Sequence, residues 1–293
     1  QTYDDNSRPT VTSFTTTAVT GSYGKDAPIF IKATTSEAIA AGGTLTATFG
    51  FGGTVVLTAA SSGTELTGTY VVPAGVSTTG LSVSSFTTTA TDLYGNTLQT
   101  TVPAGAVFAG KTIAIDTSAP VTTITAVEYA DNGAGSTGTL TLTGTNFTGS
   151  NGIGLASGSD AKSYLNWDKF VWTANGADGA SSNVVFSASD IVSATLTNST
   201  TMTVTISSGA NSTLKATSGF AAQGTADGIV VTAGFIEDIA GNPSTTDAAT
   251  ITQTYDDNSR PTVTSFTTTA VTGSYGKDAP IFIKATTSEA IAA

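Results

Sequence analysis

Residues 27–72 read APIFIKATTSEAIAAGGTLTATFGFGGTVVLTAASSGTELTGTYVV, and this stretch decides the fold class. It contains four runs rich in Thr, Val, Ile and aromatic residues, at 27–34, 44–52, 54–60 and 65–72. Gly and Ser clusters separate the runs. Short alternating runs of this kind suit half-buried strands, so the stretch predicts a β-sheet domain.

The remainder of the chain continues the pattern. Further strands are expected at 81–92, 121–130, 138–147, 193–198, 201–207 and 228–236. A longer irregular section occupies 148–182, no stretch shows sustained helical periodicity, and no apolar run is long enough to cross a bilayer. Because this strand spacing is that of immunoglobulin-like sandwiches, we predict an all-β protein of tandem immunoglobulin-like β-sandwich domains.

Composition excludes several functional classes. Charged residues make up 11% of the chain, and there is no cysteine and no histidine. Thiolate metal sites, disulfide scaffolds and His-based catalytic triads are therefore excluded. The net charge of −11 argues against nucleic acid as a partner, whereas oxygen-rich acidic surfaces favour hard cations such as calcium.

A long exact repeat organises the chain. Residues 1–41 recur without a change at 253–293, so the period is 252 residues. Periods of this length indicate arrays of domains, not solenoids of short units. We expect an immunoglobulin-like domain at 1–116, a larger one at 117–257, and the start of the next copy of the first at 258–293.

The two predicted domain ends are alike. TDLYGNTL (91–98) and IEDIAGNPS (236–244) each contain an acidic-x-x-Gly-Asn turn, and each is followed by a short strand, an Asp and a Pro. Gly supplies the positive φ of a tight turn, and Asp and Asn side chains bond to the local backbone. The Pro that follows stiffens the linker.

The last 41 residues hold about three strands, which cannot bury enough apolar surface to fold alone. We expect them to be completed by further chain beyond residue 293. Strands supplied by another molecule are the alternative.

The motifs PTVTSF, TTSEA, ATDLYGN and KTIAIDTSAP resemble the immunoglobulin-like repeats of giant bacterial adhesins and S-layer-associated proteins. Those repeats carry an Asp-x-Ala-Gly-Asn turn near the domain end, which residues 238–242 match and residues 92–96 match with Tyr94 in place of Ala. The resemblance covers nearly all of the first domain and the two ends of the second. It implies an extracellular location at the bacterial cell surface.

Calcium at the domain junctions is the sharpest chemical hypothesis, because Ca²⁺ takes six to eight oxygen ligands. The ligands expected at the first junction are Asp92, Asn96 and Asp116. Those expected at the second are Glu237, Asp238, Asn242, Asp256 and Asp257. The pair Asp256 and Asp257 recurs in the repeat as Asp4 and Asp5. Glu37, with Asp26, is a further and weaker candidate for the same end of the first domain. Turn capping by the same side chains is the alternative.

Three other chemistries are weighed and disfavoured. Trp167 and Trp172, spaced as on one strand, offer a sugar-stacking face, although a core position is favoured. Paired carboxylates could hydrolyse glycosides, but these acids lie in repeated turns, and we expect no enzyme. An isopeptide bond between Lys32 and Asn96 would require a buried triad that the sequence does not indicate.

We therefore expect a structural repeat of a long extracellular surface protein, an adhesin stalk or filament spacer stiffened by calcium. Its expected partners are neighbouring repeats of the same chain. The first alternative is a self-assembling S-layer, sheath or fibre subunit that contacts identical chains. The second is a glycan-binding module in the second domain.

Overall fold

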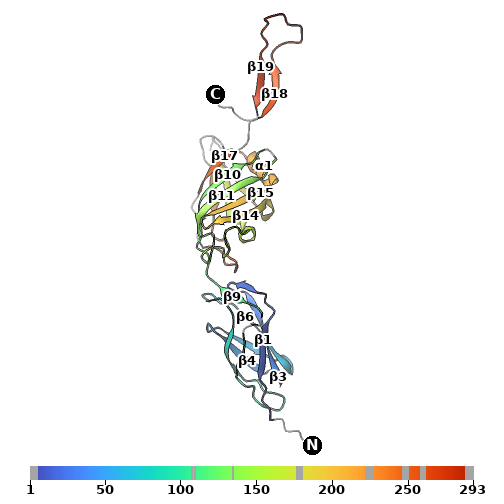
Figure 1. The fold of residues 1–293 in the computed structure, drawn as a ribbon, viewed down its shortest axis with the longest axis vertical. Coiled ribbons are helices and arrows are strands. Elements are labelled where there is room, and N and C mark those ends of the chain that lie inside the picture. The colour runs from blue at the N-terminus through green and yellow to red at the C-terminus, as the bar shows by residue number, and fades with distance from the viewer. Residues whose placement is uncertain are drawn as a thin grey trace.

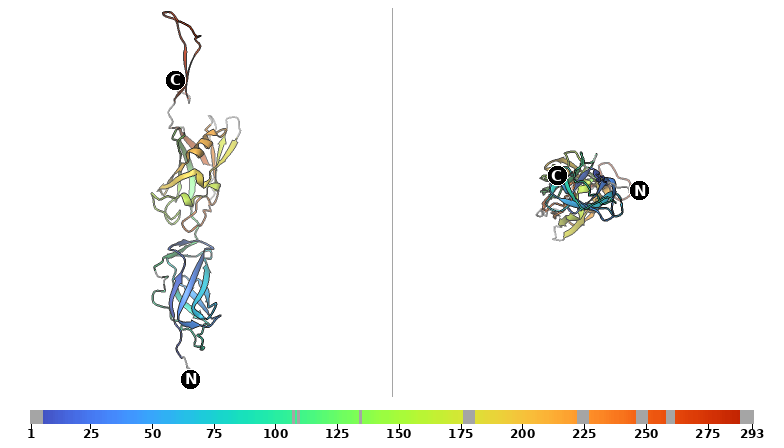
Figure 2. Two further views of the ribbon diagram at one scale, coloured as in Figure 1. Left: turned by 90° about the vertical axis from the view of Figure 1, so that its right-hand side faces the viewer. Right: turned by 90° about the horizontal axis from the view of Figure 1, so that it is seen from below.

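The computed structural model describes residues 6–106, 108, 110–133, 135–175, 181–221, 227–245, 251–257 and 262–287. Three bodies follow one another along its long axis: an N-terminal sandwich (residues 6–116), a C-terminal sandwich (117–257) and a hairpin (262–287) (Figures 1 and 2). The linker at 117–122 passes directly from the first sandwich to the second. The chain is therefore an end-to-end stack.

The described residues of the N-terminal sandwich form nine strands. They are β1 (Val11–Thr16), β2 (Gly21–Tyr23), β3 (Pro28–Ile39), β4 (Thr44–Phe49), β5 (Thr54–Thr58), β6 (Gly63–Val71), β7 (Ser77–Thr78), β8 (Val83–Thr88) and β9 (Ile113–Asp116). One sheet has the order β1-β3-β6-β5-β4-β8, and a three-stranded sheet has the order β2-β9-β7. The pairing of β2 with β9 is parallel.

Alternation places every second residue of these strands in one core. In β3, Ile29, Ile31 and Ala33 are fully buried while Phe30 faces outward. The buried residues of β4, Leu45, Ala47 and Phe49, join the same cluster. β5 and β6 pair at Thr58 and Thr67, and the buried Leu57 and Leu66 of these strands join the same core.

The C-terminal sandwich is larger and has one α-helix. Its elements are β10 (Thr123–Asp131), β11 (Gly138–Thr145), η1 (Lys162–Tyr164), η2 (Trp167–Lys169), β12 (Phe170–Asn175), β13 (Ser181–Val185), η3 (Ala188–Asp190), β14 (Ile191–Asn198), β15 (Thr201–Ile206), α1 (Ser208–Ala216), β16 (Gly228–Val231) and β17 (Ile251–Asp257). Its strands form one sheet of order β13-β12-β16-β17-β10-β11-β15-β14, in which β10 and β17 are parallel.

The all-β, sandwich-like fold class is confirmed. Helix α1 was not predicted: Ser207 caps it by accepting from the Ala210 N–H, and Leu214 is buried from a short, mostly polar segment. Trp167 begins η2 instead of lying on a strand with Trp172, and both are buried, as the favoured core position predicts. No helix in the described part of the chain is long and apolar enough to cross a membrane.

The terminal hairpin repeats β1 and β3. Strands β18 (Val263–Thr268) and β19 (Ile283–Thr287) pair antiparallel, with Phe266 opposite Ala285. In the N-terminal sandwich Phe14 lies opposite Ala33, and both hairpins have a bulge after their first paired residue. Identical sequence therefore gives identical register in two different surroundings.

This duplication provides an internal control for burial. Ile31 has no exposed surface, whereas Ile283, its copy, is 70% exposed. We expect Ile31→Ala to destabilise the N-terminal sandwich by about 2–5 kcal/mol through lost burial and a cavity, and Ile283→Ala to change stability by less than about 0.5 kcal/mol.

Denaturant unfolding followed by circular dichroism measures both variants. The tryptophan fluorescence of the folded protein should be the same in both variants as in the wild type, because both tryptophans lie in the C-terminal sandwich. Equal losses of stability in the two variants would contradict the burial difference.

Candidate functional site: the junction between the sandwiches

The Asp238–Asn242 turn lies at the end of the C-terminal sandwich that faces the N-terminal one. Asp238 Oδ1 accepts from the backbone N–H groups of Ala240 and Asn242 at 2.8 and 2.9 Å, and its Oδ2 accepts from Asn242 Nδ2 at 2.9 Å. Gly241 adopts φ +83°, which favours glycine. Each fixed residue of the motif thus has a structural reason.

The Asp92–Asn96 turn is built in the same way. Asp92 Oδ1 accepts from the N–H groups of Tyr94 and Asn96, both at 2.8 Å, and Oδ2 accepts from Asn96 Nδ2 at 2.7 Å. Gly95 has φ +93°. The two sandwiches therefore carry matching turns, although only short motifs relate their sequences.

These hydrogen bonds set the ionisation of Asp92. Desolvation opposes the charged carboxylate, but bonds from the Asn96 side chain and from the N–H groups of Asn96, Tyr94 and Gly95 outweigh it and lower the pKa of Asp92. The same logic lowers the pKa of Asp190, which accepts from the side chain and backbone of Ser187.

The Asp238–Asn242 turn also forms the contact between the sandwiches. Asn242 Nδ2 donates to the backbone oxygen of Asp116, the last residue of β9, at 2.8 Å. Gly24, buried in the loop after β2, faces the same turn: a Cβ there would lie 2.5 Å from Ala240 O and 2.9 Å from Asn242 Oδ1. A side chain at position 24 would therefore push the sandwiches apart.

The predicted ligands group differently from the expectation. Asp116, Glu237, Asp238 and Asn242 come together at the junction, whereas Asp92 and Asn96 lie at the opposite, outer end of the N-terminal sandwich. The reason is that each turn sits at the start of its own sandwich, not beside the linker that follows it in sequence.

Asp256 and Asp257 do not join that junction either. Their backbone pairs with Ala130 and Asp131 at the far end of the C-terminal sandwich. The side chains of Asp256 and Asp257, and the whole of Asp4 and Asp5, lie outside the described residues. Asp26 precedes β3 and Glu37 lies within it eleven residues later, about 35 Å away along an extended strand, so the two residues do not share one end.

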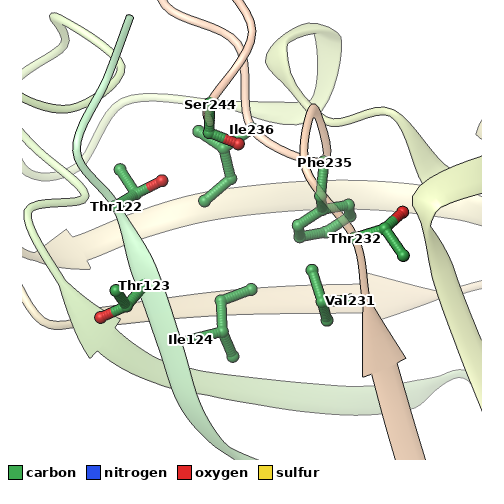
Figure 3. A pocket seen from close by; sticks show the side chains of 8 residues that line it. All are labelled: Thr122, Thr123, Ile124, Val231, Thr232, Phe235, Ile236 and Ser244. Carbon is green, nitrogen blue, oxygen red and sulfur yellow. The ribbon is translucent and has the colours of Figure 1, made fainter. Parts of the chain in front are cut away.

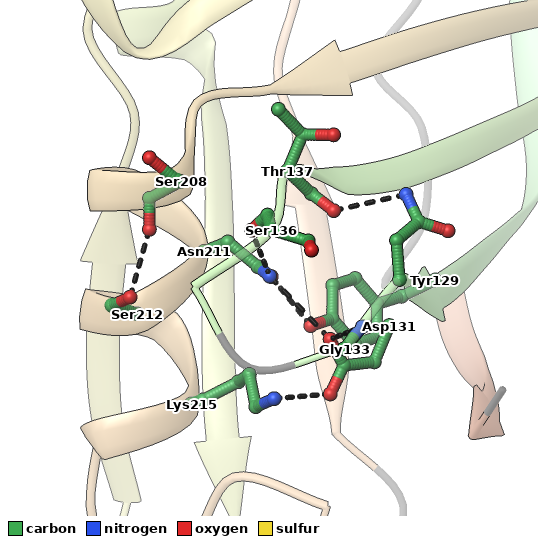
Figure 4. A network of polar contacts seen from close by, with 10 residues as sticks. Tyr129, Asp131, Gly133, Ser136, Thr137, Ser208, Asn211, Ser212 and Lys215 are labelled. Carbon is green, nitrogen blue, oxygen red and sulfur yellow. Dashed lines mark hydrogen bonds and ion pairs between the residues drawn. The ribbon is translucent and has the colours of Figure 1, made fainter. Parts of the chain in front are cut away.

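A buried polar network organises that far end (Figure 4). Asp131, almost fully buried, forms an ion pair with Lys215 of α1. Asn211 accepts from the Tyr129 hydroxyl at 2.6 Å and donates to the Ser136 backbone oxygen at 3.0 Å. Removing one partner of a buried ion pair is costly, so α1 is tied firmly to the end of β10. No spacing in the sequence indicates this pair, because its two residues are 84 positions apart.

The described carboxylates are mostly engaged in their own turns. Asp116 accepts from the Ser118 N–H at 2.9 Å, and Asp92 and Asp238 accept the hydrogen bonds of their own turns. Among the described residues, no three acidic side chains lie close enough together to hold a metal ion. The turn-capping alternative therefore accounts for the geometry seen, and calcium stays a prediction.

The hollows beside the two turns are small or open. A cavity of about 10 Å³, room for one water molecule, lies near the junction and is lined by Ile124, Val231, Phe235, Ser244 and neighbours (Figure 3). A shallow depression of about 290 Å³ at the outer end of the N-terminal sandwich is lined by Glu37, Ala38, Asp92, Leu93 and Tyr94.

The aromatic residues of the irregular section are core residues. Trp167, Phe170 and Trp172 are buried, Tyr164 is half-buried, and Trp172 Nε1 donates to the buried Asp227 at 2.8 Å. These rings are not available to stack on a sugar. Lys32 forms an ion pair with Glu65 at 2.7 Å on the sandwich surface, away from Asn96 in its turn, so the geometry does not support an isopeptide bond.

Comparisons with known proteins add no relative. No protein-family model matches the chain, and no curated protein matches its sequence. The geometry of the junction therefore carries the functional argument.

The Asp92 turn predicts acid sensitivity. A pKa lowered in the folded state stabilises the fold at pH values above the unfolded pKa, about 3.9, and this contribution is lost as the pH falls through the folded pKa. We expect Asp92→Asn to weaken the pH dependence of unfolding below about pH 4.

Urea unfolding between pH 2 and 7, followed by circular dichroism, measures this. Asp26→Asn is the matched control, because Asp26 is exposed on a loop of the same sandwich. Identical pH profiles for Asp92→Asn and the wild type would contradict the assigned role of the Asp92 carboxylate.

Proposed function

We propose that this chain is a repeat of an extracellular bacterial surface protein in which the sandwiches act as a stiff spacer. The contact between Asn242, Asp116 and Gly24 carries the proposal, because it ties two sandwiches end to end across a short linker. The resemblance of the turn motifs to adhesin repeats supports the surface location. In this role each repeat contacts the neighbouring repeats of the same chain, and the number of repeats sets the length of the spacer.

The repeat supports a second junction of the same kind. Asp116 lies four residues before Pro120, and Asp257 and its copy Asp5 lie four residues before Pro261 and Pro9. The Asp92–Asn96 turn lies at the outer end of the N-terminal sandwich. The Asp238–Asn242 turn lies at the corresponding end of the C-terminal sandwich, where it contacts the sandwich before it. In an array, the exposed Leu93 and Tyr94 at its tip would face the end of the preceding C-terminal sandwich.

Two alternatives differ in their support. Self-assembly of identical chains stays an alternative that no contact among the described residues favours. A glycan-binding role loses the aromatic surface on which it was based, because those rings are buried.

The stiffness of the junction is tested by measuring how widely the distance between a point on each sandwich is distributed. The chain has no cysteine, so Ser61→Cys and Ala216→Cys place two dyes, one on each sandwich. We expect a narrow distribution in single-molecule energy transfer, and a broader one in Gly24→Val, whose side chain would collide with Ala240. Gly21→Val is the control, because a Cβ there meets nothing within 4 Å.

A broad distribution in the otherwise unchanged labelled chain would contradict the spacer role. Lateral assembly at the same protein concentration, detected by sedimentation, would favour the self-assembly alternative instead.

Calcium stiffening is tested by thermal unfolding in excess calcium and in excess chelator. Binding to the folded state alone raises the stability by about 2.7 kcal/mol at a hundredfold excess over Kd, so we expect a higher midpoint in calcium and a smaller rise in Asp116→Asn. Coinciding midpoints would show that Asp92, Asp116 and Asp238 serve the turns and linkers alone.

A further inference from the structure

The chain enters and leaves the C-terminal sandwich through two neighbouring strands. It enters by β10, directly after the linker at 117–122, and leaves by β17, before the terminal hairpin. These strands lie side by side in the sheet and run parallel, with Val127–Asp131 beside Gln253–Asp257. Five residue pairs therefore join the first strand of this sandwich to its last. We call these five pairs the parallel clamp.

The direction of the two strands decides how the parallel clamp carries a pull along the chain. Strand β10 starts beside the linker, and β17 runs the same way and ends at the far end, next to the terminal hairpin (Figure 1). A pull on the two ends of the chain draws the start of β10 one way and the end of β17 the opposite way. The strands are then forced to slide along each other, so the load falls on all five pairs at once.

The N-terminal sandwich has the same arrangement. Gly21–Tyr23 of β2 pair in parallel with Ile113–Ile115 of β9, and β9 runs directly into the linker. A pull that reaches β2 through β1 therefore loads these pairs by sliding as well. The two sandwiches differ in the order of their other strands, yet each joins an early strand in parallel to its exit strand. This agreement points to a role under tension.

Packed side chains support the parallel clamp of the C-terminal sandwich. Tyr129 and Tyr255 are partners in it and stack, with ring centres 5.4 Å apart. Phe220 packs edge-on against both rings, at 5.4 and 5.8 Å. Asp131, in the last pair, is held by Lys215 of α1. Because hydrogen bonds are stronger where water is excluded, these rings strengthen the pairs beneath them.

We propose that the parallel pairing of an early strand with the exit strand makes each sandwich a load-bearing unit that resists unfolding when the chain is pulled along its axis. Forced unfolding is governed by the rate of unfolding and not by the equilibrium stability, so it depends on the pairs that break first. The inference rests on the proposed spacer role only in that tension acts along the chain. A flexible junction between strong sandwiches would refute the spacer role and leave the parallel clamp in place.

Pulling the same sandwich in two directions tests the parallel clamp. The chain has no cysteine, so Asn132→Cys provides one attachment point in the exposed turn directly after β10. Held at its two ends, a single molecule loads all five pairs together. Held at residue 132 and at its C-terminal end, it opens the pairs one after another, starting from Asp131 and Asp257.

We expect the rupture force of the C-terminal sandwich to be at least about twofold higher in the first direction, because several pairs share the load there. Both directions use the same Asn132→Cys variant, so the effect of the substitution itself cancels. The length of chain released identifies the sandwich that opens, since the C-terminal sandwich is the longer one. Equal forces in the two directions would overturn the proposal.

Two variants separate resistance to force from equilibrium stability. The Gln253 N–H donates to Asp227 O at 3.2 Å, on the side away from β10, so the next N–H along the strand, that of Thr254, faces β10. Thr254→Pro removes this donor from the parallel clamp. Val204→Ala is the matched control, because Val204 is a fully buried residue of β15, which pairs with β11 and β14.

We expect Val204→Ala to lower the midpoint of urea unfolding through lost burial and to leave the rupture force of the chain held at its ends unchanged. Thr254→Pro should lower that force toward the value of the opening direction. If Thr254→Pro does not fold, Val204→Ala and the two pulling directions still decide the question. A rupture force that falls in Val204→Ala in step with the urea midpoint would overturn the proposal.

Discussion

The carboxylates of Asp92 and Asp238 each hold one end of a sandwich in shape, and the junction between the two sandwiches depends on Asp238. Each accepts two backbone N–H groups and the amide of an Asn four residues later. In the second sandwich this Asn is thereby fixed where its Nδ2 also reaches the backbone of Asp116. One turn motif thus serves local structure and contact between domains at once.

The contact across the junction uses backbone more than side chains. Asn242 binds a carbonyl oxygen, and Gly24 brings a second stretch of backbone against Ala240. Backbone groups are present whatever the side chains are, so such a junction can join two sandwiches of different sequence. The cost is that one position must remain glycine, because any Cβ at residue 24 would overlap the turn.

Much of the fold was predictable because strand alternation is a local property. The run APIFIKAT places Ile29 and Ile31 inward and Phe30 outward wherever it forms a strand. The hairpin at 262–287 illustrates this, since it keeps the register and bulge of β1 and β3 without their core. Helix α1 was missed because its burial rests on Ala210, Asn211 and Leu214, too short and polar a set to show a period.

The candidate site was predictable in its residues and not in its grouping. The motif Asp-x-x-Gly-Asn identifies a turn, but sequence order places Asp92 near Asp116, whereas the chain runs back along the sandwich between them. Gly24 and the Asp131–Lys215 pair depend on contacts between distant segments, which no spacing rule reveals. Phe14 and Phe266 have the same neighbours in sequence, yet Phe14 is buried against Phe86 and Phe266 is exposed. Burial in this chain is therefore assigned by what packs against a strand, and the strand itself supplies only the face to be covered.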